Sequence, residues 1–295
     1  MKVLVLGGKG FIGRYVVRAL AARGADVSIG TRRTKAANEL RLILHQLKRT
    51  EDWYHEIAPF DVIVNCVGIL RERWGECYAD VYLHAPAAIA QACVAQSKRF
   101  IHVTALGLHV NASSGFLREK LAGEAAIAKL GGEACIVRPS LLDGPDGFGS
   151  RWLRRVSQWP IHFVPVDAQG ALAPLDVNDL GEAIAALCAC PVAALPASVE
   201  LGGETHFKLA HYLKALRTKP AAAFTLQVPA WMVRVAAHAL DVLHLTPLSW
   251  GHVELMRRDN APHTGDAYAL RHWLGRAPTN VGSRVIASAT SAVIA

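Results

Sequence analysis

A short apolar run followed by closely spaced glycines constrains the fold of this chain more than any other feature. The run VLVL at residues 3–6 leads directly into GGKGFIG at residues 7–13, and residues 11–22 then have helical character. An uninterrupted apolar run of this kind is typical of a strand buried on both faces of a parallel sheet. Glycines 7, 10 and 13 permit a tight turn, a close approach to a pyrophosphate and packing of the helix on the sheet. The stretch predicts dinucleotide binding at the N-terminus of the first helix, where free N–H groups face the phosphates; a turn packed for structural reasons is the alternative.

Strands and helices alternate through the first half of the chain. Further strands are expected at residues 25–29, 41–45, 61–65, 100–104 and 134–137, the one at 41–45 preceded by a short helix. Helices are expected at residues 75–96 and 116–130, and Pro86 implies a kink or restart inside the first of these. Strand–helix alternation of this length predicts an α/β protein with a doubly wound parallel sheet, a Rossmann fold.

After Pro139 the alternation stops. Residues 144–147 form a turn cluster, residues 152–159 have the pattern of a short amphipathic helix, and residues 180–190 read as a helix with Asp179 as its N-cap. The remainder, to about residue 278, mixes helices and loops and predicts a smaller, mainly helical lobe. We expect residues 1–178 to form the dinucleotide-binding domain and residues 179–295 a C-terminal lobe for a substrate or partner, with segments around 140–170 contributing.

Composition limits the class of protein and its surroundings. A chain of 295 residues with 52% hydrophobic and 19% charged residues is typical of a globular protein. The net charge of +8 suits an anionic ligand, a nucleic acid or an anionic membrane surface, or is ordinary surface charge. Because no long basic run occurs, we expect no nucleic-acid partner. The six cysteines lack zinc spacing, so we expect no metal site and a reducing compartment.

The same sequence gives expectations about membranes and location. The apolar run at the N-terminus is too short for a signal peptide, and no segment reaches about 18 uninterrupted apolar residues. We therefore expect a cytoplasmic protein without a membrane span. A peripheral contact with the inner membrane, through a helix at residues 228–250, stays open as an alternative.

The end of the second strand indicates which dinucleotide is preferred. A carboxylate at this place would accept hydrogen bonds from the ribose hydroxyls of NAD, but the chain has Gly30, Thr31, Arg32 and Arg33 instead. Two guanidinium groups and a hydroxyl suit a 2′-phosphate through charge-assisted hydrogen bonds. The sequence therefore favours NADP(H) over NAD(H), and the alternative makes both arginines solvated loop residues.

Several stretches resemble the short-chain dehydrogenase/reductase superfamily in its extended or atypical branch. They are the GxxGxxG spacing, DVIVNCVGIL (61–70), RFIHVTALG (99–107), VRPSLLDGPDGF (137–148), PLDVNDLGEAI (174–184) and ELMRRDN (254–260). In combination they are also similar to the nucleotide-binding accessory subunits of respiratory complex I and their bacterial relatives. Sugar-nucleotide epimerases and dehydratases share the same scaffold.

The resemblance implies roles only where residues match. Val67 and Gly68 correspond to the segment beside the adenosine ribose, Lys120 to the lysine that holds the nicotinamide ribose, and Pro139 and Ser140 to the turn that flanks the nicotinamide. Together with the residues argued above, the expected cofactor-binding set is Gly7, Gly10, Phe11, Ile12, Gly13, Thr31, Arg32, Arg33, Val67, Gly68, Thr104, Lys120, Pro139 and Ser140.

The chain departs from the family pattern at the position that carries the chemistry. Phe116 stands where the family has a tyrosine four residues before Lys120, and phenylalanine has no proton to give. Thr104 stands where serines are common, and the aspartate often found near the adenine is absent from residues 45–47. Lys120 would keep its binding role or become the ionisable group itself, because a lysine in a dry pocket has a lowered pKa.

Other candidate residues have ordinary alternatives. His109 could be an acid and Arg71 could reach a substrate anion, although a surface location is the ordinary explanation for each. Arg234, His238, Asp241 and His244 recur at helical spacing between Trp231 and Trp250, which predicts one polar stripe on an apolar helix. Core packing is the ordinary explanation of that helix; contact with a membrane, a quinone-like lipid or a protein partner is the alternative.

Three functions follow from these observations. The first is an NADP-dependent oxidoreductase acting on an apolar or quinone-like substrate with help from Lys120. The second is a non-catalytic nucleotide-binding protein of a respiratory or quinone-linked assembly, in which bound NADPH stabilises the fold or reports redox state. The third is a sugar-nucleotide epimerase or dehydratase, which the missing tyrosine disfavours. Whether the chain is an enzyme stays open at this point.

Overall fold

Seven parallel strands form the central sheet in the computed structural model, which describes residues 1–243, 249–266 and 268–281. Their order is β10-β6-β5-β4-β1-β2-β3 and every neighbouring pair is parallel. The chain order reverses between β1 and β4, so the predicted doubly wound Rossmann sheet is confirmed. The strands are β1 (Lys2–Leu6), β2 (Asp26–Thr31), β3 (Glu39–Arg41), β4 (Val62–Asn65), β5 (Arg99–Val103), β6 (Ala134–Pro139) and β10 (Ser198–Leu201).

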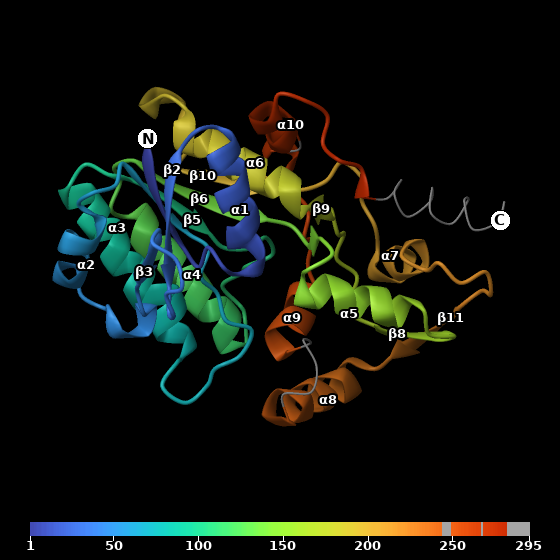
Figure 1. Cartoon of the computed structure of the whole chain (residues 1–295). Helices are drawn as coiled ribbons and strands as arrows, with labels where there is room; N and C mark the ends of the chain where they lie inside the picture. Colours follow the sequence, from blue (N-terminus) through green and yellow to red (C-terminus); the bar gives the residue numbers. More distant parts are fainter. Residues whose placement is uncertain (244–248, 267, 282–295) are drawn as a thin grey trace.

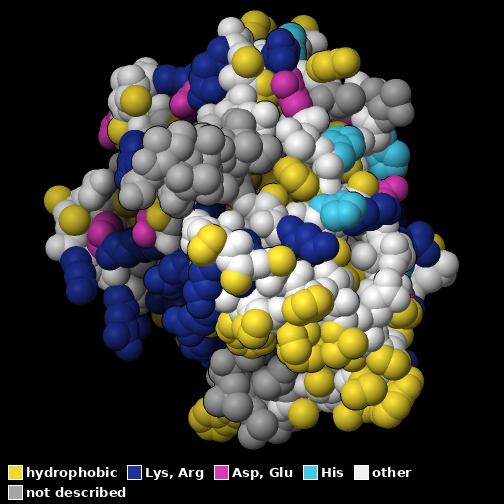
Figure 2. All heavy atoms as spheres, turned by 90° about the vertical axis from the view of Figure 1, so that its right-hand side faces the viewer, with side chains coloured by type: hydrophobic (Ala, Val, Ile, Leu, Met, Phe, Trp, Pro, Cys, Tyr) yellow, Lys and Arg dark blue, Asp and Glu magenta, His cyan; other side chains and the backbone are white. Residues whose placement is uncertain are grey.

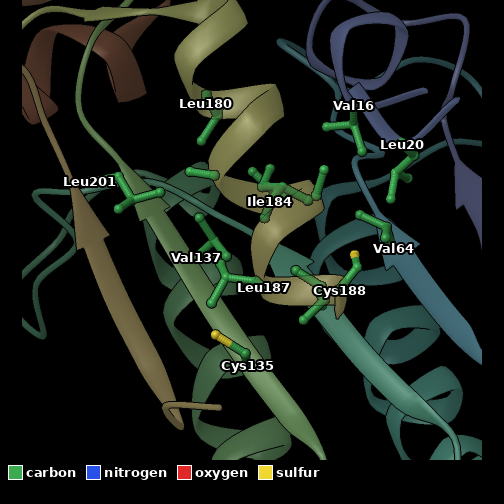
Figure 3. Close-up of a cluster of buried hydrophobic side chains, with 14 of the residues drawn as sticks. Val16, Leu20, Val64, Cys135, Val137, Leu180, Ile184, Leu187, Cys188 and Leu201 are labelled. Carbon is green, nitrogen blue, oxygen red and sulfur yellow. The ribbon is translucent and has the colours of Figure 1, made fainter. Parts of the chain in front are cut away.

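Helices cover both faces of the sheet (Figure 1). Helices α1 (Phe11–Ala22), α6 (Val177–Ala189) and α10 (Ala269–Leu274) pack on one face, and α2 (Glu51–Ile57), α3 (Ala85–Ala95) and α4 (Gly115–Ala128) on the other. Because successive strand residues point to opposite faces, the central strands β1, β4, β5 and β6 supply side chains to both cores. Figure 3 shows the first core, where Ile184 and Leu187 of α6 lie over Val137 of β6.

The third strand is not where the sequence predicts it. A strand at residues 41–45 is wrong, because β3 is Glu39–Arg41, Leu44–Gln46 form a single 3₁₀ turn, and residues 32–38 before β3 are not helical. Leu42 and Leu44 are both buried in the core that contains Trp53 of α2. Apolar residues two apart, which resemble a strand in the sequence, here belong to a loop that covers the edge of that core.

The helix before β5 changes its winding next to Pro86, where the sequence predicts a kink or restart. Asp80–His84 form one π-helical stretch, η2, and α3 follows directly. Proline has no N–H, so the carbonyl of Tyr82, four residues earlier, loses its helical donor. Gly123 of α4 faces this carbonyl, and a Cβ at residue 123 would lie 1.9 Å from its oxygen. The proline and the glycine together let α4 pack unusually close to η2.

The C-terminal lobe contains short strands as well as the expected helices. Beside its helices it contains two small parallel sheets, β8 with β11 and β7 with β9. Its elements are β7 (Leu142–Asp143), α5 (Phe148–Ser157), β8 (Ile161–Pro165), β9 (Leu175–Asp176), α7 (Leu209–Ala215), β11 (Phe224–Val228), α8 (Ala230–Leu243) and α9 (Trp250–Leu255), and the short turns η3 (Val192–Ala194) and η4 (Thr264–Asp266) lie elsewhere along the chain.

Chain segments beyond residue 178 also return to the Rossmann layers. Strand β10 is an edge strand of the sheet, and most of α6 and all of α10 belong to the helical layer beside α1. The predicted N-cap of α6 is wrong. Asp176 caps the helix by accepting a hydrogen bond from the Asn178 amide, whereas Asp179 lies in the first turn and binds Arg276 and Thr279. Among the described residues, no helix has the length and hydropathy needed to cross a bilayer.

Candidate functional site

The glycine loop between β1 and α1 forms an open cradle at the carboxyl edge of the sheet. Gly7 has a positive φ of 73°, and a Cβ on Gly13 would lie 2.2 Å from the Gly7 carbonyl oxygen. Gly10 is the N-cap of α1, and no side chain caps the helix or adds an acid to its first turn. The first-turn N–H groups are thus left for an anion, so the loop fits the pyrophosphate of a dinucleotide.

A cavity of about 290 Å³ extends from this cradle along the sheet edge. Of the expected cofactor residues it is lined by Gly7, Gly10, Thr31, Arg32, Val67 and Gly68. Leu42, Leu44 and His45 close the end near β3, where the family often has an aspartate. These residues form a pocket of suitable size and polarity for an adenosine diphosphate.

The remaining expected residues lie around the cavity rather than in its wall. Gly13 contributes to packing, and the ring of Phe11 packs against Gly144 and Gly147. Ile12 is half-buried against the core of the α1 face. Arg33 is exposed, and its carbonyl accepts from Lys9. Residues expected near the nicotinamide also lie outside this wall: Thr104, Lys120, Pro139 and Ser140.

Charged side chains of both signs surround the end of β2. The guanidinium of Arg32 lies 3.5 Å from the carboxylate of Glu76, which also lines the cavity. Lys9 of the glycine loop pairs with Glu39 at 2.7 Å. A phosphate entering here would compete with Glu76 for Arg32. Glu76 is a participant that the sequence did not reveal, because it lies in the loop after β4 and not beside the arginine.

Lys120 of α4 is buried in an aromatic environment. Its Nζ lies 4.2 Å from the ring centre of Tyr82 and 5.3 Å from that of Phe116. Burial lowers the pKa of Lys120 to about 8, partly offset by the charge of Glu124. No hydrogen bond to the Nζ is present within the described part of the chain. The lysine is therefore a cation held by ring faces, with donors left for a ligand.

Phe116, which stands where the family has a tyrosine, is buried among aromatic side chains. Its ring makes edge contacts with Tyr78 and Tyr82 and lies 5.2 Å from the ring of His252 on α9. A Cβ on Gly251 would lie 2.8 Å from Phe116. We call Tyr78, Tyr82, Phe116 and His252 the aromatic box.

Tyr82 does not replace the missing acid. Its hydroxyl donates to the Ile69 carbonyl and accepts from the Ile69 amide at 2.8 Å, which fixes the loop after β4 over the lysine. Burial raises the pKa of this phenol further above its usual value. Both hydrogen bonds of the Tyr82 hydroxyl are thus made to the backbone of Ile69, so this hydroxyl is not left for a substrate.

A row of polar side chains crosses the α4 face of the sheet. Asn65, His102, Arg138 and Glu200 lie near the carboxyl ends of β4, β5, β6 and β10, and strand register places them on the same face. Asn65 and His102 are joined at 3.2 Å, and Asn65 also accepts from the Val67 amide. Burial, and then the charge of Lys120, lowers the pKa of His102 to about 3. His102 is therefore neutral near pH 7, and Lys120 has no second positive charge from this histidine beside it.

Glu124 links this row to α4. Its carboxylate accepts two hydrogen bonds from Arg138, at 2.7 and 2.9 Å, and one from Thr104 at 2.7 Å. Glu124 is buried and lies one helical turn after Lys120. The hydroxyl of Thr104 is thus directed at Glu124, which fixes the orientation of both side chains.

The RRDN stretch fastens the turn after β6. Asn260 accepts from Ser140 and from the Leu141 amide, and donates to the Leu106 carbonyl at 2.9 Å. Ser140 also donates to the Asn260 carbonyl, and the Pro139 carbonyl accepts from the Leu106 amide. Ser140, expected beside the nicotinamide, therefore holds the C-terminal lobe to the sheet.

The other candidate side chains are distributed over different surfaces. His109 lines a separate polar cavity of about 810 Å³ with Arg138, Glu124 and His263, and burial lowers its pKa. Arg71 lies with Arg32 at a neighbouring opening. Of the stripe on α8, Arg234 and His238 contact the ring of Trp250. Trp231 is exposed, the surroundings of Asp241 are not described, and His244 lies outside the described residues.

Several residues of this site were missed by reading the sequence. Tyr78 and Tyr82 are one helical turn apart, as are Lys120 and Glu124, so their spacing was an available signal. Asn65, His102, Arg138 and Glu200 each interrupt an apolar strand near its end, which is a weaker signal. Their meeting depends on strand pairing that a single sequence does not display.

Comparison with known proteins agrees with this geometry. Residues 3–193 match the model of the NAD-dependent epimerase/dehydratase family. A mitochondrial NADH dehydrogenase [ubiquinone] 1 alpha subcomplex subunit 9 from Dictyostelium discoideum is 27% identical over 80% of this chain and 70% of its own length. The rat protein of the same name is 30% identical over 71% of this chain and 59% of its own length. A ceramide reductase of Caulobacter vibrioides is 28% identical over 65% of this chain and 62% of its own length.

Solved structures share the fold over nearly the whole chain. A short-chain dehydrogenase/reductase superfamily protein from Agrobacterium tumefaciens with bound NAD has a TM-score of 0.69 at 16% identity, covering 100% of this chain and 97% of its own. A human epimerase family protein with NADPH has a TM-score of 0.65 at 18% identity, covering 98% and 99%. The glycine cradle, the parallel sheet and the family match lead to one conclusion: this chain belongs to the NAD-dependent epimerase/dehydratase family and is a nicotinamide-dinucleotide-binding protein.

Proposed function

We propose that the protein is an NADP(H)-dependent reductase of a carbonyl or quinone group on an apolar substrate, with Lys120 as its ionisable residue. The observation that carries this proposal is the buried Lys120 amine, which has a pKa near 8 and no hydrogen-bonding partner among the described residues. An amine with a pKa near the working pH exchanges protons effectively. The relative named a ceramide reductase supports a substrate of lipid character.

The residues divide the work between binding and proton transfer. The glycine loop and the first turn of α1 would hold the pyrophosphate, with Thr31 and Arg32 at the 2′ position. When bound, the dinucleotide supplies a hydride. The Lys120 ammonium supplies the proton that a carbonyl oxygen takes up as its carbon is reduced, so that the product is an alcohol. The aromatic box and the Tyr82–Ile69 contact would keep water from this lysine.

Substitution of Lys120 tests the proposal directly. Purified protein is incubated with NADPH and a panel of quinones, enones and long-chain ketones, and the oxidation of NADPH is followed by its absorbance. Lys120→Met is expected to lose turnover by a factor of at least about 100, whereas Lys129→Met, an exposed lysine at the end of the same helix, retains it. NADPH affinity is measured in parallel, because Lys120 is also a candidate ligand of the ribose. Equal turnover in both variants would refute the assigned role of Lys120.

The preference for NADP(H) is a separate proposal supported by Thr31 and Arg32 in the cavity wall. Arg32→Ala with Arg33→Ala is expected to weaken NADPH binding at least tenfold and NADH binding little, because each charge-assisted phosphate contact is lost. Glu76→Gln is expected to strengthen NADPH binding, since it removes the carboxylate that pairs with Arg32. Calorimetry with both coenzymes measures this, and equal weakening of both by the arginine substitutions would contradict the preference.

A second candidate is a non-catalytic nucleotide-binding protein within a larger assembly. The packing of Phe116 by Gly251 and the other box residues favours it, because these contacts fill the place beside Lys120. The relatives named as subunits of NADH dehydrogenase also favour it. Micromolar NADPH binding without turnover on any member of the panel would support this candidate. Phe116→Tyr adds a second criterion, since new carbonyl reductase activity would indicate a site that lacks only its acid.

A further inference from the structure

The C-terminal lobe contains an apolar cavity that the dinucleotide site does not use. Its volume is about 320 Å³, and α5, β8, α7, α8 and α9 contribute to its wall. Of its lining side chains among the described residues, His162 is the only ionisable one; the others are aliphatic, aromatic or methionine. Buried members such as Leu153, Leu213 and Val253 form the floor. The cavity lies between two hydrophobic clusters, at the place where α8 meets the rest of the lobe.

His162 offers little to a polar ligand. It is buried, its Nε2 lies 2.9 Å from the Ser157 carbonyl, and its Nδ1 is closed off from solvent without a partner in the described part of the chain. A sugar nucleotide or a quinone ring needs donors for its oxygens. A wall of this composition instead favours a hydrocarbon chain, which gains by leaving water and needs no hydrogen bonds.

The opening of the cavity is also apolar. Four lining residues are 39% to 54% exposed and therefore form its rim: Trp159, Ile161, Phe163 and Met232. Phe224 and Leu226 of β11 are exposed as well and pair in register with Ile161 and Phe163. Figure 2 shows hydrophobic side chains gathered over this part of the molecule, with Lys and Arg side chains beside them. Apolar patches of this extent mark sites of interaction with apolar partners.

Positive charge lies beside the rim without compensating acids. Arg155 is exposed on α5, three residues after Trp152 on the same helix and four residues before Trp159, which follows the end of the helix. Arg217 donates to the Trp159 carbonyl at 2.8 Å. Within the described residues neither arginine has a carboxylate partner. An anionic head group at the rim would meet these guanidinium groups.

From the apolar wall, the exposed apolar rim and the uncompensated arginines, we propose that this cavity binds the alkyl chain of a single-chain anionic amphiphile, such as a long-chain carboxylate. The inference concerns binding alone and does not depend on the reductase activity proposed above. Ala236 and Ala237 of α8, both in the lining, keep the cavity open because larger side chains at these positions would fill it.

Fluorescence quenching tests the site below the critical micelle concentration. The chain has seven tryptophans, of which Trp152 and Trp159 line the cavity. Dibromostearate is titrated, and saturable quenching in the micromolar range, reversed by unlabelled stearate, is expected. The affinity for dibromostearate, obtained from the quenching curve, should be at least tenfold weaker for Ala236→Trp and for Val228→Trp. These two substitutions block the cavity from two different elements. Ala239→Trp, an exposed position of α8 outside the lining, should bind like the wild type.

Two comparisons complete the experiment. NADPH affinity of each blocking variant shows that the chain is folded and its dinucleotide site intact, so a result from either variant decides the question. The wild-type protein should bind the methyl ester of dibromostearate several-fold more weakly than the free acid. Arg155→Ser should bind the free acid several-fold more weakly than the control variant Arg151→Ser does. Quenching that does not saturate, or that persists in the blocking variants, would overturn the cavity assignment; equal binding of ester and acid would overturn the anionic head.

Discussion

Lys120 illustrates how one buried charge connects stability to function. Its pKa is lowered by burial to about 8 from an ordinary value near 10.5, which means that its charged form is less stable in the native protein than in the unfolded chain. The ring faces of Tyr82 and Phe116 recover part of that cost. A residue held in this way is ready to lose or take up a proton near neutral pH.

A pH-dependent stability follows from this shift. Below pH 8 both states are protonated, and the native state carries the full cost of the buried charge. Between pH 8 and about 10.5 the unfolded chain still binds the proton that the native protein has released, so the free energy of unfolding rises with pH. Lys120→Met should be more stable than the wild type by about 1–3 kcal/mol at neutral pH, with a difference that shrinks as the pH rises towards the unfolded pKa. Urea unfolding at several pH values measures it.

Lys129→Met is the control for this experiment, because Lys129 is exposed at the end of the same helix. Its stability difference from the wild type should be within about 0.5 kcal/mol and independent of pH. Subtracting the unfolding free energies of Lys129→Met from those of Lys120→Met at each pH cancels the titration of all other groups. A difference for Lys120→Met that does not change across the window between the two pKa values would contradict the lowered pKa.

At the scale of elements, the close packing of α4 on η2 positions the lysine. Gly123→Ala is expected to destabilise the protein by about 2–4 kcal/mol, because the new methyl group would lie 1.9 Å from the Tyr82 carbonyl oxygen. Alanine is otherwise the better helix former, so propensity alone predicts the opposite sign. Chemical denaturation gives the stability, and NADPH affinity shows whether Lys120 has moved.

Gly149 provides a matched control within another helix. It lies in α5, and a Cβ added there would meet no neighbouring atom within 4 Å, so Gly149→Ala should stabilise by about 0.5–1 kcal/mol. If Gly123→Ala lowers the free energy of unfolding and Gly149→Ala raises it, the close approach of α4 to η2, and not helix propensity, determines the effect at Gly123. Stabilisation by both substitutions would mean that α4 and η2 can separate without cost.

The elements differ in how far their sequences predict them. The first strand, the glycine turn and helix α1 were predictable because their signals are local: an apolar run, glycines and a basic residue before Gly24. The third strand was misplaced because Leu42 and Leu44 alternate like a strand but are buried by Trp53 of a later helix. The polar row across β4, β5, β6 and β10 was not predicted, since it exists only after four distant segments pair in one register.

The same distinction applies to the candidate site. Lys120 and Phe116 were found through the resemblance to the family's tyrosine and lysine four residues apart, and the structure adds their surroundings. Glu76 beside Arg32, Tyr82 over Lys120 and Asn260 beneath Ser140 join residues 44, 38 and 120 positions apart. Contacts of that separation are made by the tertiary fold, and no local pattern in the chain encodes them.

For the whole molecule, Asn260 is one of the buried residues that connect the C-terminal lobe to the sheet. Its side chain donates to the Leu106 carbonyl after β5 and accepts from the Leu141 amide after β6. Its own amide donates to the Ala171 carbonyl, so three distant segments meet at one buried residue. Asparagine is required because the site presents a carbonyl on one side and N–H and O–H donors on the other.

Asn260→Asp should therefore destabilise the protein by about 2–4 kcal/mol, because a buried carboxylate would face the Leu106 carbonyl and the donor to it would be lost. Thermal unfolding measures the loss, and NADPH affinity should fall with it, since Ser140 is fixed by the same residue. Asn38→Asp is the control: Asn38 also donates to a carbonyl, that of Val27, but it is exposed, so the change should cost less than about 1 kcal/mol. If both variants unfold at the same temperature as the wild type, the lobe is held by its other contacts and Asn260 does not make the connection between lobe and sheet.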